Sequence, residues 1–111
     1  MAASPSLSNF ELMVMLAIIR IGDDAYGVSI SKEIEATIGS EVQLGSVYDA
    51  LTRLEAKGLI ASALGEATPE RGGRAKRHFR TTSRGLRLVR ETRQSLVKLG
   101  NGLPELKGGE A

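Results

Sequence analysis

One stretch near the middle of the chain constrains the fold more than any other: GGRAKRHFR, residues 72–80. Its two glycines permit a tight turn, and a cation-dense extended run follows them. The helical pattern GSVYDALTRLEAKGLI, residues 45–60, comes shortly before it. The runs LIASALGE and RAKRHFRTT therefore predict the two arms of a hairpin, with residues 67–73 at its tip.

The charges of the chain are unevenly distributed. Residues 71–93 hold nine Lys or Arg and one acid, a net charge of +8. Residues 1–70 hold four Lys or Arg and ten acids, a net charge of −6. The overall charge of +2 hides this basic block. Such asymmetry favours a polyanionic partner.

The composition narrows the class of protein. A chain of 111 residues predicts one domain with a small core. Cysteine is absent, which excludes disulfides, thiol catalysis and cysteine zinc sites. With one histidine, His78, and scattered acids, we expect no enzyme, no metal and no cofactor. The longest apolar run, residues 12–19, is too short to cross a membrane, and we see no signal peptide, so we expect a cytoplasmic protein.

Helix signals divide the rest of the chain. Ser8 begins an S-x-x-E capping box, and the segment FELMVMLAIIRI after it is apolar around most of its circumference. A second helix is expected over roughly residues 28–38, and a third from near Ser46. Thr82 or Ser83 caps a last helix of at most about two dozen residues.

The last helix carries an apolar stripe typical of helix pairing. Val89, Leu96 and Leu103 recur every seven residues, as in a short coiled coil. Together with the apolar first helix, this stripe predicts a homodimer. The residues expected at the dimer interface are Phe10, Met13, Leu16, Val89, Leu96 and Leu99.

A helix followed by a basic hairpin is the layout of a winged helix-turn-helix, a fold that holds duplex DNA. The predicted fold class is therefore mainly α with a small β-hairpin. Residues 1–82 would form this DNA-binding domain, residues 83–104 a C-terminal dimerisation helix, and residues 105–111 a flexible tail.

All but one of the predicted DNA-binding residues fall into two groups; the exception, Tyr26, leads into the second helix. In the third helix, hydroxyl groups and one guanidinium point to hydrogen bonds with bases or phosphates. In the hairpin, cations point to phosphate neutralisation or entry into the minor groove. The full predicted set is Tyr26, Ser46, Tyr48, Thr52, Arg53, Arg71, Arg74 and Lys76.

Tyr48, Arg53 and the hairpin cations each have a plainer interpretation. Tyr48 could be half-buried support, and Arg53 could pair with Glu55 or Asp49 on a solvated face. The hairpin could be a solvated basic loop. At the level of the whole chain, the alternative is a winged-helix module for protein–protein interaction without DNA function, against which the basic block argues.

Three segments resemble the PadR-like transcriptional regulators. AYGVSISKEIE resembles the Tyr-Gly-containing second helix of that family, and GSVYDALTRLEAKGLI resembles its Gly-Thr/Ser-x-Tyr-x-x-Leu-x-Arg-Leu-Glu-x-x-Gly-Leu-Ile signature. GGRAKRHFRTTSRG resembles its wing. The resemblance covers about residues 7–103, and the short C-terminal part is similar to that of compact members with a single dimerisation helix.

The resemblance implies a homodimeric repressor whose first and last helices form the interface. It also implies two recognition helices in successive major grooves of a palindromic operator. Some compact relatives bind flat aromatic drugs between tryptophans, but this chain has no Trp. The sequence leaves open the effector, the operator, the target genes and the choice between repressor and activator.

Overall fold

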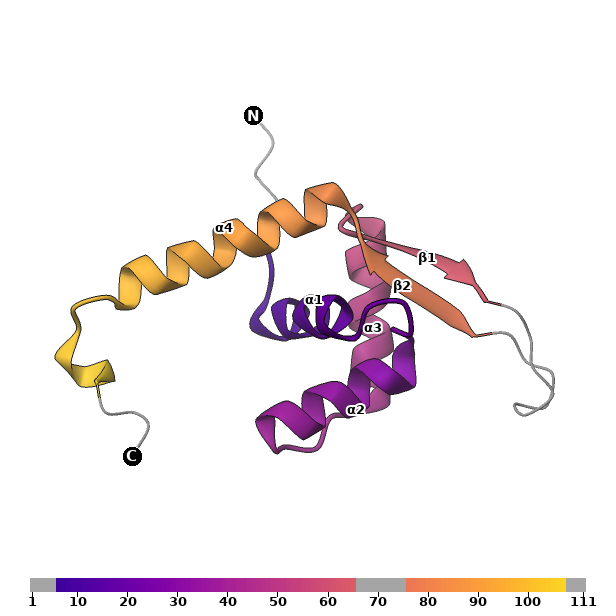
Figure 1. Ribbon diagram of the computed structural model, residues 1–111, viewed down its shortest axis with the longest axis horizontal. Helices are drawn as coiled ribbons and strands as arrows, with labels where there is room; N and C mark the ends of the chain where they lie inside the picture. Colours follow the sequence, from indigo (N-terminus) through magenta and orange to yellow (C-terminus); the bar gives the residue numbers. More distant parts are fainter. Residues whose placement is uncertain (1–5, 66–75, 108–111) are drawn as a thin grey trace.

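The computed structural model describes residues 6–65 and 76–107. Within them the chain is mainly helical with a two-stranded antiparallel hairpin, which confirms the predicted fold class (Figure 1). The elements are, in order, α1 (Asn9–Ile21), α2 (Gly27–Ile38), α3 (Leu44–Ala56), β1 (Ile60–Leu64), β2 (Arg77–Thr81), α4 (Ser83–Gly100) and a short 3₁₀ helix (Pro104–Leu106).

The helix starts follow the local signals in the sequence. The Ser8 hydroxyl accepts a hydrogen bond from the Glu11 amide at 3.1 Å, and the Glu11 carboxylate accepts one from the Ser8 amide at 2.9 Å. This is the predicted capping box. Thr82 caps α4 by accepting from the Gly85 amide at 3.0 Å. Helix α3 begins at Leu44, earlier than predicted, because the carbonyl of Gln43 already accepts a hydrogen bond from the Val47 amide.

Helices α1, α2 and α3 form a three-helix body around an aliphatic core. One face of α3 is buried in this core through Val47, Ala50, Leu51 and Leu54. The spacing of these residues follows the helical repeat, so the opposite face of α3 is left in solvent. The three-helix body therefore fixes α3 through its buried face and leaves the opposite face of α3 open to a partner.

The hairpin is attached to this body at its base. Its antiparallel register runs from Ile60 opposite Thr81 to Leu64 opposite Arg77. Phe79, at the centre of β2, is buried in the core, and its amide donates to the carbonyl of Ala25 at 2.8 Å. The far end of the hairpin extends away from the helices (Figure 1).

Helix α4 packs on the body only through its beginning. A β-carbon at Gly85 would overlap the carbonyl of Leu59 and come within 2.9 Å of the Met15 side chain, so glycine permits this close approach. Val89 is the last residue of α4 in the core. Beyond it, α4 runs past α1 and away from the body (Figure 1). Across residues 6–65 and 76–107, no helix combines the length and apolar character needed to cross a membrane.

Candidate nucleic-acid interface

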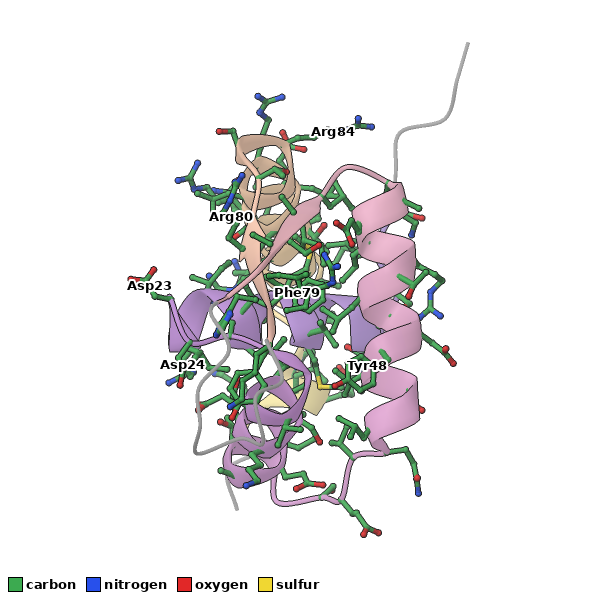
Figure 2. All side chains as sticks on the ribbon, turned by 90° about the vertical axis from the view of Figure 1, so that its right-hand side faces the viewer. Asp23, Asp24, Tyr48, Phe79, Arg80 and Arg84 are labelled. Atoms are coloured by element: carbon green, nitrogen blue, oxygen red, sulfur yellow. The ribbon has the colours of Figure 1, made fainter. Side chains whose placement is uncertain are left out.

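The exposed face of α3 carries both neutral and charged hydrogen-bonding groups, the charged ones being Asp49, Arg53 and Glu55. Ser46, Tyr48 and Thr52 are exposed there, all three predicted at the site. The Thr52 hydroxyl donates to the Tyr48 carbonyl at 3.0 Å, which holds its oxygen on the helix surface. Figure 2 views the molecule from the side toward which the hairpin extends, and α3 lies lengthwise on that side. Since the charges exposed on α3 are of both signs, this face is suited to hydrogen bonds with bases more than to neutralising phosphates.

Two further predicted residues meet where the hairpin joins α2. The Lys76 ammonium lies 3.5 Å from the centre of the Tyr26 ring, a cation–π contact. Tyr26 also forms an isolated β-bridge with His78, and the two rings meet edge to face with centroids 5.8 Å apart. Nε2 of His78 lies 3.6 Å from Oδ1 of Asp24. The beginning of β2, on the tip side of the hairpin, is thus fixed to the start of α2 by side chains as well as by the isolated β-bridge.

Arg53 has a partner that the sequence did not indicate. Its Nε donates to Oε2 of Glu11 at 2.9 Å, and not to Glu55 or Asp49. Lys57, the residue that follows the last residue of α3, contacts Oε1 of the same carboxylate at 3.2 Å. The S-x-x-E pattern identified Glu11 as a helix cap, but a pairing across 42 residues leaves no local sequence signal. Glu11 therefore ties the start of α1 to the second half of α3.

The environment of Glu11 keeps it ionised. Its side chain is 4% exposed. Burial by itself raises the pKa of this carboxyl, but hydrogen bonds from Ser8, Arg53 and Lys57, with the charge of Lys57, outweigh burial and lower the pKa from 4.5 to about 2. The Arg53 bond uses one of five N–H donors of the guanidinium.

Cations continue from β2 onto α4. Arg77 donates to the hydroxyl of Ser62 at 3.0 Å, while Arg80 and Arg84 are exposed and lie near one end of the molecule in Figure 2. The predicted residues Arg71 and Arg74 lie outside the described residues. The described part of the wing is therefore basic along β2 and into the first turn of α4.

The residues predicted for dimerisation are divided between two surfaces. On α1, Phe10 and Met13 are half-buried and Leu16 is exposed. The same helix and α2 border a small hollow of about 150 Å³ beside Met13 and Leu16. On α4, Leu96 is 56% exposed and Leu99 77% exposed.

Val89 differs from the other predicted dimerisation residues. It is 3% exposed and lies in the core of its own chain. It therefore supports α4 from within the protomer, whereas Leu96 and Leu99 present their apolar surface outward.

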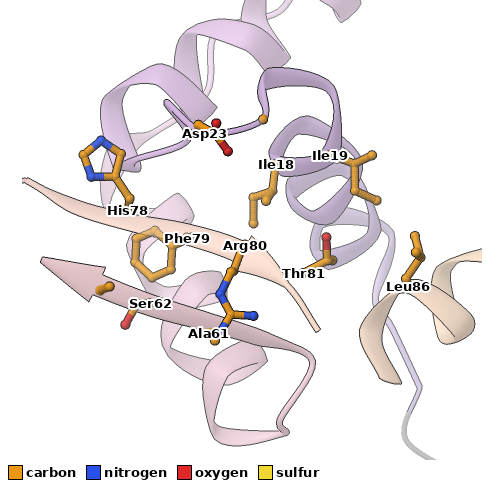
Figure 3. Close-up of a pocket in the computed structure, with 12 residues that line it drawn as sticks. Ile18, Ile19, Asp23, Ala61, Ser62, His78, Phe79, Arg80, Thr81 and Leu86 are labelled. Carbon is orange, nitrogen blue, oxygen red and sulfur yellow. The ribbon is translucent and has the colours of Figure 1, made fainter. Parts of the chain in front are cut away.

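A second hollow, of about 380 Å³, lies between α1, the hairpin and the start of α4 (Figure 3). Ile18, Ile19 and Leu86 give it an apolar lining. Asp23 and Arg80 also line it, so its charge is mixed. Because an apolar lining with a carboxylate offers little attraction for phosphate, we do not include this hollow in the nucleic-acid interface.

An exposed helix face beside a basic hairpin is the arrangement that duplex-binding winged helices use. The model of the transcriptional regulator PadR-like family matches residues 15–91 of this chain. The chain belongs to the PadR-like family. This family consists of transcription regulators that bind DNA and not of enzymes, so the protein is a DNA-binding transcription regulator with a winged-helix fold.

Solved structures agree with this assignment. The chain is 31% identical to a PadR family transcriptional regulator from Eggerthella lenta DSM 2243, with a TM-score of 0.67 over 85% of this chain and 80% of that one. It is 25% identical to a transcriptional regulator from Clostridium thermocellum, with a TM-score of 0.67 over 80% and 83% of the two chains. A PadR-like regulator from Bacillus cereus, 23% identical over 81% and 82% of the two chains, shares the fold with a TM-score of 0.67. The comparison with curated proteins gives no match.

Proposed function

We propose that this PadR-like regulator is a dimeric repressor that acts in the cytoplasm on a palindromic operator. The observation that carries the proposal is the exposed face of α3 beside the anchored, basic hairpin. In this arrangement α3 enters the major groove while the hairpin follows the phosphates into the minor groove. Repression then follows from occupying the operator and excluding other proteins from it.

The roles of the individual residues follow from their positions. Ser46, Tyr48 and Thr52 face bases or phosphates from α3. Arg53 reaches DNA with N–H groups other than the one bonded to Glu11. Tyr26 and Lys76 contact the DNA backbone from the place where the beginning of β2 meets α2, and the proposal extends to Arg71 and Arg74.

The dimer supplies the second recognition helix. The exposed Leu96 and Leu99 of α4 are proposed to pack against the α1 surface around Phe10, Met13 and Leu16 of the partner subunit. Burying such side chains stabilises an assembly by roughly 1.5–3 kcal/mol for each residue that becomes fully buried. Two-fold symmetry of the dimer then matches the two half-sites of a palindrome.

The direct experiment is selection of binding sites from random duplex pools, followed by fluorescence anisotropy. We expect a palindromic consensus, and binding to it that is on the order of 10³-fold tighter than to scrambled duplex. A reporter whose promoter overlaps the selected site should be silenced. A selection without enrichment would overturn the proposal in favour of a protein-binding module, and activation of the reporter would overturn the repressor role alone.

A further inference from the structure

Gly27, the first residue of α2, lies directly against the side chain of Tyr48 on α3. It is buried, and a β-carbon built on it would lie closer than 3.0 Å to three side-chain atoms of Tyr48: the ring carbons Cε1 and Cζ and the hydroxyl oxygen. Real β-carbons essentially never approach other atoms so closely. The ring of Tyr48 therefore occupies the space that any side chain at position 27 would need.

The backbone does not explain the glycine. Gly27 is not among the glycines with positive φ, so an alanine fits its backbone conformation. Alanine is also a better helix former than glycine. The three atoms nearest to such a side chain all belong to Tyr48.

The backbone around Gly27 cannot easily shift to make room. The Tyr26 amide donates to the Ser29 hydroxyl at 2.9 Å, and the Ala25 carbonyl accepts from the Phe79 amide at 2.8 Å. Tyr26 is also bridged to His78. With the chain held on both sides, the ring of Tyr48 has to move instead.

Tyr48 itself is 47% exposed, and the part of its side chain that lies against Gly27 is the hydroxyl end. Figure 2 shows Tyr48 on the flank of α3 that is turned toward α2. We propose that Gly27 is a positioning residue: it provides the seat that fixes the Tyr48 hydroxyl at the DNA-facing surface of α3. This inference rests on the proposed DNA contact of Tyr48.

A double-mutant cycle measured by DNA binding tests whether Gly27 acts through Tyr48. Gly27→Ala, Tyr48→Ala and the double variant are compared with the wild type on the selected operator and on random duplex. Gly27→Ala should weaken operator binding about tenfold and leave random duplex nearly unchanged. In the Tyr48→Ala background, Gly27→Ala should have no effect on binding, because no ring remains to be displaced.

Thermal unfolding of the same four proteins gives a test independent of DNA. Gly27→Ala should lower the Tm when Tyr48 is present and raise it when Tyr48 is replaced by Ala. A purely structural role of Gly27 in helix packing would lower the Tm in both backgrounds. Equal Tm losses, or equal affinity losses, in the two backgrounds would overturn the proposal.

Tyrosine fluorescence reads the ring directly. The chain has two tyrosines and no tryptophan, so Tyr26→Phe leaves Tyr48 as the only emitter. In that background Gly27→Ala should increase quenching by iodide, and unchanged quenching would contradict the seat. If the wild type bound no duplex, the proposed function would fail, and the positioning role in DNA binding would fail with it. The opposite Tm changes in the two backgrounds and the iodide quenching would still show whether Gly27 holds the Tyr48 ring in place.

Discussion

Glu11 shows how one side chain serves two elements. It caps α1 and holds Arg53 of α3 and Lys57 directly after α3. Its pKa in the folded chain, about 2, lies below the ordinary 4.5, so its contribution to stability is complete above pH 4.5 and is lost as the pH falls toward 2.

Replacing this carboxylate should be felt at neutral pH. Glu11→Gln is expected to lower the free energy of unfolding by about 1–3 kcal/mol, since hydrogen bonds to a charged group are lost. Urea unfolding at neutral pH measures the loss. The difference from the wild type should narrow as the pH falls below about 4.5. A difference that stays constant down to pH 3 would show that Glu11 does not act through its charge.

Comparing variants of Arg53 and Lys57 separates a loss of DNA contact from a loss of stability. Both are bound to Glu11, but Arg53 lies nearer the N-terminal half of α3. Arg53→Ala and Lys57→Ala should reduce stability to a similar extent. Only Arg53→Ala should cost roughly 1–3 kcal/mol in operator binding, and less on random duplex. Anisotropy titrations distinguish the two variants, and equal affinity losses would assign Arg53 to the fold alone.

At the scale of elements, the hairpin cations should contribute equally to the affinity for every duplex, whatever its sequence. Lys76→Ala and Arg74→Ala are each expected to weaken operator and random duplex together and to reduce the slope of log affinity against log salt by roughly one. Lys107→Ala, a cation beyond α4, is the control and should change neither. An effect confined to the operator would move these residues from phosphate contact to base reading.

The local elements were predictable because their signals are local. The capping box at Ser8 and the cap at Thr82 depend on neighbours within a few residues. The site was less predictable because its geometry joins distant segments. The contact of Gly27 with Tyr48 and the bond of Glu11 to Arg53 cross between helices, and the burial of Val89 depends on how α4 meets the body.

For the whole molecule, the exposed apolar side chains of α4 predict a dimer that can be broken without unfolding the chain. Leu96 is exposed in the protomer, so Leu96→Asp should yield monomers that keep the helical circular dichroism spectrum. Light scattering at micromolar concentration measures the change in mass. Ser95→Asp places the same charge one residue away and should remain dimeric. A wild-type monomer would contradict the prediction.

The charge asymmetry of the chain should make DNA binding strongly dependent on salt. Phosphate contacts from two protomers add, and six to ten of them would lose roughly 10³–10⁵ in affinity between about 50 and 200 mM salt. The acidic N-terminal 70 residues should keep the basic wing toward the duplex. Titrations of one operator across this range measure the slope, and a flat response would argue for a protein partner.

The outer part of α4 has a consequence for cells that contain several related regulators. The side chains of residues 93–99 are all exposed within the protomer, so substitutions there leave its own core untouched. This stretch can therefore diverge after gene duplication at little cost to folding. Changes confined to it would be enough to stop two sister proteins from forming mixed pairs, so each could evolve its own operator without interference from the other.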